Sequence, residues 1–289
     1  MKAAVCERYG PPEVLQIAEV EAPVPAHDEI LVRIHASTVN SSDWYVRSGI
    51  PMSPLAVQIP FRFLVGFRRP RRRIIGMILS GEVVEAGRTV TRFRPGDRVW
   101  AFTKLHFGAY AEFTCLKENS SVAIAPAGVA HDEAAAIAYG GLMALHYLRR
   151  GGIRSGQRVL VYGASGAAGT AAVQLARHAG AEVTGICGPD NLELVASLGA
   201  AAVLDYTTVE ALPDGATYDL VLDAVGKRRS SPLKEACRQA VAPGGAYVSV
   251  DDGTPGFTAA DLATLAELVE SGAIRAVIDR VYPLERIAE

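Results

Sequence analysis

The residues with the clearest chemical use form a glycine-rich turn. An apolar run at 158–162 is typical of a buried strand, and Gly163, Gly166 and Gly169 follow it in the spacing G-x-x-G-x-x-G, before an amphipathic helix over 168–179. Glycines let the chain turn tightly, so that main-chain N–H groups approach a diphosphate at the positive end of the helix dipole. The turn predicts dinucleotide binding; the alternative is a Gly/Ala turn needed only for helix–sheet packing.

The end of the next predicted strand, 182–187, should distinguish the two pyridine dinucleotides. A carboxylate there would hold the adenosine ribose hydroxyls and favour NAD, but Cys187 occupies the position. The missing acid leaves room for a 2′-phosphate and favours NADP(H). Asp190 is an acid where an arginine or lysine would help most, so it argues the other way and keeps NAD(H) open.

Two regions of the chain must position this turn. Residues 1–126 contain short alternating or apolar runs broken by prolines, which predicts a closed or nearly closed antiparallel β structure. From residue 131 onward strands alternate with helices, which predicts a parallel sheet with helices on both faces. The expected elements are strands at 158–162, 182–187, 202–206, 219–224 and 246–250, helices at 168–179, 191–198, 231–241 and 259–271, a strand-like stretch at 274–281 and a helix that begins at 284.

Composition and charge exclude several classes of protein. The chain has 289 residues, is 49% hydrophobic and carries a net charge of −2, which excludes disorder and general nucleic-acid binding. The N-terminus has no apolar stretch before its charges, and the uncharged stretch 159–176 is interrupted by glycines, so neither a secretory signal nor a membrane span is predicted. Four scattered cysteines argue against a disulfide framework and a zinc ribbon and favour a reducing cytoplasm.

Short motifs in a fixed order connect the chain to a known family. Around the glycine turn they are VNSSD at 39–43, GEVV at 81–84, PGDRV at 95–99, GAYAE at 108–112, SLGA at 197–200, DY at 205–206, DAVG at 223–226 and ESG at 270–272. With this set the chain resembles, over essentially its whole length, the zinc-independent quinone oxidoreductase branch of the medium-chain dehydrogenase/reductase superfamily. The resemblance implies an α/β plus β fold: a GroES-like antiparallel β-barrel domain with an inserted Rossmann doubly wound parallel sheet.

The resemblance also implies a domain order. Residues 1–126 would form the first part of a GroES-like substrate domain, 127–254 the Rossmann dinucleotide-binding domain, and 255–289 a return segment toward the first domain. The family's usual final helix and barrel strand are missing after Glu289, so either the chain is incomplete or the barrel lacks a strand. No room exists between Val250 and Ala259 for the strand that often forms the family's dimer contact, which argues against dimerisation by that edge; a homodimer is still possible.

Zinc sites can be compared with the family residue by residue. Zinc-dependent alcohol dehydrogenases of this superfamily carry a cysteine where this chain has Asn40, and Gly-His-Glu where it has Gly76, Met77 and Ile78. Neither Met77 nor Ile78 supplies an imidazole or a carboxylate, and the lobe of four closely spaced cysteines is missing as well. We therefore expect neither a catalytic nor a structural zinc ion.

By resemblance, Asn40 and Tyr45 would face the nicotinamide and the substrate, with Tyr45 as a proton donor or a ring-stacking wall. The structural alternatives are a turn residue for Asn40 and a half-buried barrel aromatic for Tyr45. We expect Asp43 to be structural and to bond nearby backbone amides. The residues expected to bind the cofactor are Gly163, Ala164, Ser165, Gly166, Ala167, Ala168, Gly169, Cys187, Asn191, Tyr206, Ala224, Val225, Gly226 and Ser249.

The expected reaction is hydride transfer from NADP(H) to a quinone-like, small electrophilic acceptor that needs no Lewis acid. One alternative is an enone or alkenal double-bond reductase on the same scaffold; reduction of enoyl thioesters is less favoured because residues 50–52 carry no hydroxyl. Another alternative is a non-catalytic NADPH-binding sensor or RNA-binding protein. The segment 61–73, FRFLVGFRRPRRR, raises this last alternative with five arginines in six residues; it also fits a lid, a membrane-surface patch or a solvated loop.

Overall fold

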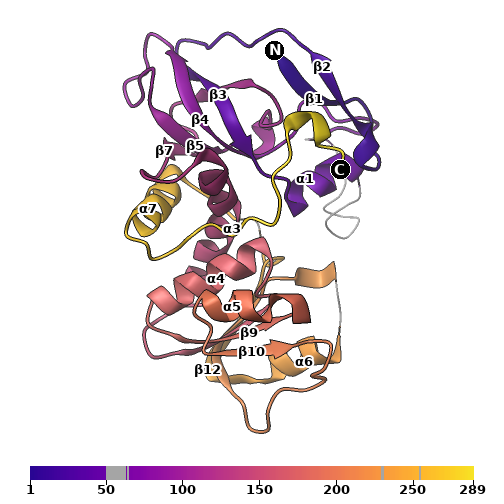
Figure 1. The fold of residues 1–289 in the computed structure, drawn as a ribbon, viewed down its shortest axis with the longest axis vertical. Coiled ribbons are helices and arrows are strands. Elements are labelled where there is room, and N and C mark those ends of the chain that lie inside the picture. Colours follow the sequence, from indigo (N-terminus) through magenta and orange to yellow (C-terminus); the bar gives the residue numbers. More distant parts are fainter. Residues whose placement is uncertain (50–62, 64, 229–230, 254) are drawn as a thin grey trace. The chain divides into compact units, whose positions relative to one another are not determined.

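The computed structural model describes residues 1–49, 63, 65–228, 231–253 and 255–289, which divide into two compact units (Figure 1). The first unit contains Met1–Ala138, Thr258–Ala266 and Ile278–Glu289, and the second contains Tyr139–Phe257 and Glu267–Val277. The domain bounds expected from the sequence stay a prediction. Within the described ranges, no helix is both long enough and apolar enough to cross a membrane.

The first unit is mostly antiparallel β structure, as the proline-broken runs predict. Five strands form a sheet in the order β6-β3-β4-β5-β7, and β1 pairs with β2 in a separate sheet. Isolated bridges link Ala3 to Ala111 and Val5 to Ile74. The strands are β1 (Lys2–Cys6), β2 (Leu15–Glu19), β3 (Glu29–Ser37), β4 (Ile78–Ala86), β5 (Arg98–Phe102), β6 (Phe113–Lys117) and β7 (Val122–Ile124).

Alternation along these strands builds the core of the first unit. Ile30 and Val32 of β3 are fully buried, as are Leu79 and Val83 of β4, because successive side chains of a strand point to opposite faces. A second cluster lies around Ile75, and partly buried side chains of the last residues of the chain pack against it. Short helical elements of this unit include η1 (Pro12–Val14), α1 (Ser41–Ser48), η2 (Lys104–His106) and η5 (Leu284–Arg286).

The second unit contains a five-stranded parallel sheet in the order β10-β9-β8-β11-β12. The chain order reverses between β8 and β11, and the carboxyl ends of strands beside such a switch point commonly bind ligands. The strands are β8 (Arg158–Tyr162), β9 (Glu182–Cys187), β10 (Ala202–Asp205), β11 (Tyr218–Asp223) and β12 (Val241–Ser249). The parallel sheet predicted from the alternation of strands and helices is confirmed.

Helices connect these strands, as expected for a doubly wound sheet. They are α4 (Ala167–His178), η3 (Pro189–Asn191), α5 (Leu192–Ser197), η4 (Gly226–Arg228) and α6 (Pro232–Gln239). Two further helices, α3 (His131–Arg150) and α7 (Ala259–Glu270), run from one unit into the other along the chain. The sheet core consists of side chains such as Leu160, Ile186 and Val221, all fully buried.

The strand predicted at 274–281 is wrong, since the described chain is irregular there. The side-chain oxygen of Gln174 accepts the Arg275 N–H at 2.9 Å, and its amide nitrogen donates to the Arg275 carbonyl at 3.1 Å. A side chain from α4 thus replaces the strand partner for this residue. The helix predicted from residue 284 is likewise shortened to the single 3-10 turn of η5.

Candidate functional site

The glycine turn connects β8 to α4, and packing within the chain explains why two of its three positions must be glycine. Gly163 has φ +85°, and a Cβ there would lie 2.6 Å from the Cγ2 of Val225. A Cβ on Gly169 would lie 2.1 Å from the carbonyl oxygen of Gly163, so α4 packs directly on the turn. Gly166 differs, because a Cβ there would meet only the Gly163 oxygen at an ordinary 3.6 Å. Packing within the chain therefore leaves the glycine at 166 unexplained.

Main-chain hydrogen bonds fix this turn to the neighbouring strand. The N–H groups of Gly163 and Ala164 both donate to the carbonyl of Ile186 at 2.9 Å. Gly166 is the N-cap of α4 and, having no side chain, leaves the first N–H groups of the helix without the usual N-cap hydrogen bond. Gly166 and Ala167 are exposed, whereas Ala164 is fully buried. The amino end of α4 is therefore open and electropositive, as an anion site requires.

Cys187 and Tyr206 meet at the carboxyl ends of β9 and β10. The Tyr206 N–H donates to the Cys187 carbonyl at 3.1 Å, and a Cβ on Gly188 would lie 3.2 Å from the Tyr206 hydroxyl oxygen. Burial, and then the charge of Asp205, raise the pKa of the Cys187 thiol, so it is neutral at physiological pH. Tyr206 and Asp190 are exposed, and Asn191 is half-buried. The last residue of β9 is therefore neutral, and two acids lie beside it: Asp190 in the following turn and Asp205, the register partner of Cys187 on β10.

A buried carboxylate organises the carboxyl end of β11. Asp223 is 1% exposed, and its Oδ1 accepts the N–H groups of Val225 at 3.1 Å and Gly226 at 3.0 Å. Its Oδ2 lies 2.7 Å from the ammonium nitrogen of Lys234, which comes from α6 and also donates to the Gly226 carbonyl. The carboxylate thus holds the turn 224–226 in one conformation. Sequence reasoning missed Asp223 and Lys234, although an acid directly before an Ala-Val-Gly turn is a usable signal.

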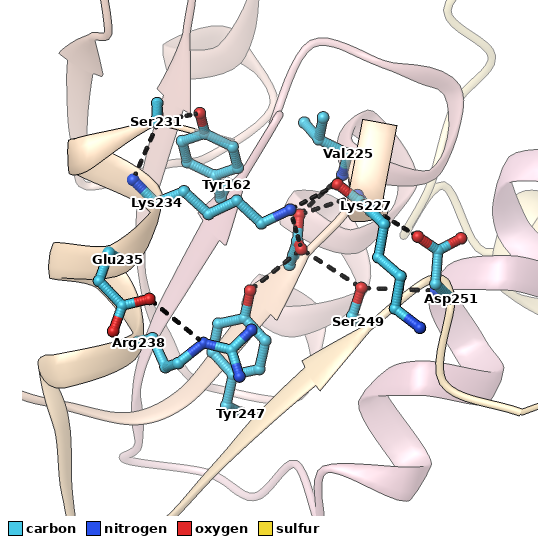
Figure 2. A network of polar contacts seen from close by, with 12 residues as sticks. Tyr162, Val225, Lys227, Ser231, Lys234, Glu235, Arg238, Tyr247, Ser249 and Asp251 are labelled. Carbon is cyan, nitrogen blue, oxygen red and sulfur yellow. Dashed lines mark hydrogen bonds and ion pairs between the residues drawn. The ribbon is translucent and has the colours of Figure 1, made fainter. Parts of the chain in front are cut away.

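Side chains of β12 complete this network (Figure 2). The hydroxyl groups of Tyr247 and Ser249 donate to Asp223 Oδ2 at 3.0 and 3.3 Å. Burial, and then the charge of Asp223, raise the pKa of Tyr247, so its hydroxyl stays protonated. The Arg238 guanidinium lies over the Tyr247 ring, 4.3 Å from its centre. The network brings Ser249 and the 224–226 turn, both predicted from the sequence, to one place.

The remaining predicted residues, Asn40 and Tyr45, belong to the first unit. Asn40 is the N-cap of α1, and its Oδ1 accepts the N–H groups of Ser42 at 2.9 Å and Asp43 at 3.2 Å. The Asp43 carboxylate accepts the Asn40 N–H at 3.4 Å, which completes a capping box. Tyr45 is half-buried, and its ring lies edge-on to that of Trp44. The turn interpretation of Asn40 therefore has a specific structural basis.

Asp43 is a buried acid in the first turn of α1. Its Oδ1 has no hydrogen-bond partner among the described residues. Burial raises the pKa of Asp43 to about 7, against the opposing effects of the Tyr110 hydroxyl and two backbone N–H groups. Arg47, on the same helix, is buried and donates to the Gly10 carbonyl at 2.8 Å rather than to this carboxyl group. Asp43 therefore combines a structural role with titration near neutral pH.

The positions that hold zinc in alcohol dehydrogenases offer little to a metal here. The Oδ1 of Asn40 is occupied by the α1 cap, Met77 is 7% exposed and Ile78 is fully buried. In the part of the chain that the structure describes, no group of three or more histidine, cysteine, aspartate or glutamate side chains could hold a metal ion. The donor chemistry at these positions therefore does not fit zinc.

Comparison with protein families finds two matching models. The model for the alcohol dehydrogenase GroES-like domain matches residues 26–145, and the model for zinc-binding dehydrogenases matches residues 167–281. The NAD(P)H oxidoreductase RTN4IP1 of mouse mitochondria is 32% identical over the whole chain and 85% of its own length. The quinone oxidoreductase of Pseudomonas aeruginosa is 32% identical over 90% of the chain and 76% of its own length.

Solved structures show the same architecture. The quinone oxidoreductase of Coxiella burnetii matches with a TM-score of 0.85 over the whole chain and 93% of its own, and at 24% identity this likeness concerns the fold. The quinone oxidoreductase of Pseudomonas syringae matches with a TM-score of 0.80 at 27% identity, over 99% of the chain and 94% of its own. A GroES-like domain together with a Rossmann sheet is therefore the fold of this chain, as predicted.

Proposed function

Because this chain belongs to the medium-chain dehydrogenase/reductase superfamily, in its quinone-oxidoreductase branch, we propose that it is a zinc-independent, NADP(H)-dependent reductase of quinone-like acceptors. The family makes the chain an oxidoreductase; the cofactor, the acceptor and the lack of zinc are the proposal. The observation that carries it is the open amino end of α4, where no neighbour requires Gly166 to lack a side chain. A diphosphate that approaches the main chain closely accounts for this glycine.

The residues present fit a dinucleotide that crosses the switch point of the sheet. In this proposal the diphosphate lies against the main chain of residues 163–169. Cys187 and Tyr206 lie at the ends of β9 and β10 on one side of β8, with Asn191 in the η3 turn that follows β9, and the turn 224–226 and Ser249 lie on the other side. These are the cofactor-binding residues expected from the sequence.

The chain positions the reactants rather than supplying the redox chemistry. A bound nicotinamide supplies the hydride. Asp223 fixes the N–H groups of Val225 and Gly226 before any ligand arrives, so binding loses little freedom there. Lys234 balances the buried carboxylate, and Tyr247 stays neutral, so the network presents no uncompensated charge to a bound cofactor. Asn40 and Tyr45 are proposed to face the acceptor.

The preference for NADP(H) is supported by the neutral end of β9. The Cys187 thiol is 2% exposed and uncharged, so no carboxylate stands there to hold ribose hydroxyls. Titration of the protein with NADPH and with NADH, followed by nucleotide fluorescence, tests this preference. Asp190→Asn should strengthen binding of NADPH more than of NADH, because it removes an exposed negative charge near the expected 2′-phosphate. Tighter binding of NADH by the unmodified protein would contradict the preference.

The zinc-independent part of the proposal rests on the occupied and apolar positions of Asn40, Met77 and Ile78. Elemental analysis of protein purified without chelator should find zinc far below one ion per chain. Activity should survive dialysis against a chelator. Stoichiometric zinc, or activity that zinc restores after dialysis, would contradict the proposal.

Initial rates of NADPH oxidation test the acceptor. A benzoquinone should be reduced faster than a short enal, because hydride transfer to a quinone leaves a stabilised hydroquinone anion that water protonates on oxygen, whereas the enolate left by an enal needs a proton delivered to its α-carbon. The reverse order would support the alternative of an enone or alkenal reductase. Tight NADPH binding without turnover on either acceptor would support the non-catalytic alternative.

The proposed compartment is a reducing one, the cytoplasm. The four cysteines are free and buried, which supports such a compartment. Relatives from mitochondria and chloroplasts mean that the compartment needs its own measurement, by fractionation of the source cells.

A further inference from the structure

Arginines form a basic surface on the first unit that the proposed reaction does not use. Residues 66–73, here named the arginine loop, contain five arginines, and all of them are exposed: Arg68, Arg69, Arg71, Arg72 and Arg73. Most of the loop lines an open groove of about 910 Å³ together with Glu7. In a chain with a net charge of −2, this density of positive charge is local.

The backbone of the arginine loop is fixed to the core. The Cys6 N–H donates to the Arg73 carbonyl at 2.6 Å, and the Arg71 N–H donates to the Val65 carbonyl at 2.7 Å. The Tyr9 hydroxyl donates to the carbonyl of Gly66 at 2.7 Å. Gly66 has φ +127°, and a Cβ there would lie 2.0 Å from the carbonyl oxygen of Arg69, so the turn is tight. The guanidinium groups therefore project from a defined turn.

Most of this charge has no acidic partner among the residues that the structure describes. Arg73 forms an ion pair with Glu7, the one acid among the described residues that line the groove. Among the ion pairs between described residues, none includes Arg68, Arg69, Arg71 or Arg72. Four guanidinium groups held this close repel one another, and an anionic partner would relieve the repulsion.

Two exposed aromatic rings adjoin the charges. Phe63 and Phe67 are 56% and 55% exposed, and their ring centres lie 4.8 Å apart in an edge-to-face arrangement. Neighbouring exposed aromatic side chains keep apolar surface in water and commonly mark an interaction site. Phe67 directly precedes Arg68, so apolar and cationic groups share one surface.

We propose that Phe63 and the arginine loop dock this protein onto an anionic lipid bilayer. A surface that joins aromatic rings to a cluster of arginines matches the boundary between acyl chains and negatively charged headgroups. Single-stranded RNA is the competing anionic partner, but it binds aromatic rings through their open faces. Here the two rings pack against each other edge to face, which favours insertion as one apolar unit. The docking does not depend on the proposed reaction.

Co-sedimentation of the full chain with vesicles tests the proposal. Vesicles of phosphatidylcholine containing about one-third phosphatidylserine should bind the protein at about 0.1 M salt, and pure phosphatidylcholine vesicles should not. A variant with Arg68, Arg69, Arg71 and Arg72 changed to Gln should bind at least about tenfold more weakly, since each basic group near such a surface strengthens binding roughly fivefold. Phe63→Ser with Phe67→Ser should weaken the binding that persists at higher salt.

A matched control separates this surface from overall charge. Changing Arg88, Arg94, Arg154 and Arg280 to Gln removes the same charge from exposed positions elsewhere, and vesicle binding should stay within about twofold. Thermal melting and NADPH titration would verify that each variant is folded. Absence of binding to phosphatidylserine vesicles, or an equal loss in both sets of variants, would overturn the proposal. Tighter retention of a single-stranded RNA than of vesicles at the same salt would also overturn it.

Discussion

The ammonium nitrogen of Lys234 lies 2.7 Å from the carboxylate of Asp223, and this pair connects α6 to the carboxyl end of β11. The two side chains are only 12% and 2% exposed. Since the same carboxylate accepts the N–H groups of Val225 and Gly226, the ion pair controls the shape of a turn proposed to touch the cofactor. A buried charge that loses its partner is strongly destabilising.

Lys234→Met should lower the free energy of unfolding by about 3 kcal/mol, because Asp223 would stay buried without its cation. Urea unfolding followed by circular dichroism measures the change. Glu235→Gln is the matched control on the same helix, because Glu235 and Arg238 form a 3.8 Å ion pair in which both side chains are exposed to solvent. We expect the control to change stability by less than about 0.5 kcal/mol. Equal losses in the two variants would contradict the structural role of Lys234.

Replacement of the turn glycines should separate folding from binding. Gly166→Ala should cost less than about 1 kcal/mol, because the new Cβ has room and alanine is only a poorer N-cap than glycine, and it should weaken NADPH binding about tenfold or more by covering the end of α4. Gly169→Ala should instead destabilise the fold by about 2 kcal/mol, because its Cβ would overlap the Gly163 carbonyl. Thermal melts and NADPH titrations measure the two effects.

Gly256→Ala provides the control for the glycine variants, because no atom of the described residues lies within 4 Å of the Cβ it would introduce. It should change neither stability nor binding. If Gly166→Ala bound NADPH as tightly as the unmodified protein, the diphosphate would not lie at this turn. The main observation behind the proposed function would then no longer support it.

Asn40 substitutions should distinguish helix capping from a role toward the acceptor. Asn40→Ser keeps a capping oxygen and should change stability by less than about 0.5 kcal/mol, whereas Asn40→Ala should cost about 1 kcal/mol. If the side-chain amide faces the acceptor as proposed, both variants should lower kcat/KM for a benzoquinone. Unchanged kinetics in Asn40→Ser would leave Asn40 with its capping role alone.

Asp43 should make stability depend on pH between about 4 and 7. Burial raises its pKa from 3.8 to about 7, so in this range the native carboxyl keeps a proton that the unfolded chain has released. Stability from this group is therefore present at low pH, falls as pH rises through the window and levels off above it. Asp43→Asn stays neutral, so its stability relative to the unmodified protein should rise by a few kcal/mol from pH 4 to 7.

Urea unfolding at several pH values measures this difference. His131 acts in the opposite direction, because burial, then Arg98 and His35, lower its pKa from 6.5 to about 4, and stability from it is lost as pH falls. Since His131 is present in both proteins, its effect cancels in the comparison. A difference that does not change with pH would show that Asp43 is ionised throughout.

Much of the second unit could be predicted from local patterns. The strands at 158–162 and 182–187 have the predicted bounds, because continuous apolar runs between turn residues carry that information locally. The region 241–245 could not be read this way. Pro243 and two glycines indicate a turn, yet β12 already begins at Val241, with an irregular register against β11. Pairing with a neighbouring strand overrides the local preference there.

The candidate site was only partly predictable for a similar reason. The glycine turn follows from spacing, but Lys234 resembles any polar residue on an amphipathic helix until the sheet places Asp223 beside it. The role of Gln174 could not be predicted from the sequence for the same reason, because its hydrogen-bond partner is the backbone of Arg275, far along the chain. Contacts between distant segments are not encoded in the period of either segment alone.

Two contacts fix the position of helix α4. Near its beginning Gly169 packs against the Gly163 carbonyl, and near its middle the Gln174 side chain forms two hydrogen bonds with the main chain of Arg275. Each residue of an α-helix turns the next by about 100°. One residue added to or deleted from α4 between Gly169 and Gln174 would therefore turn Gln174 away from the main chain of Arg275 while Gly169 stayed on the turn. The spacing from Gly169 to Gln174 thus sets two things at once: how α4 packs on the glycine turn, and where the irregular segment around residue 275 attaches.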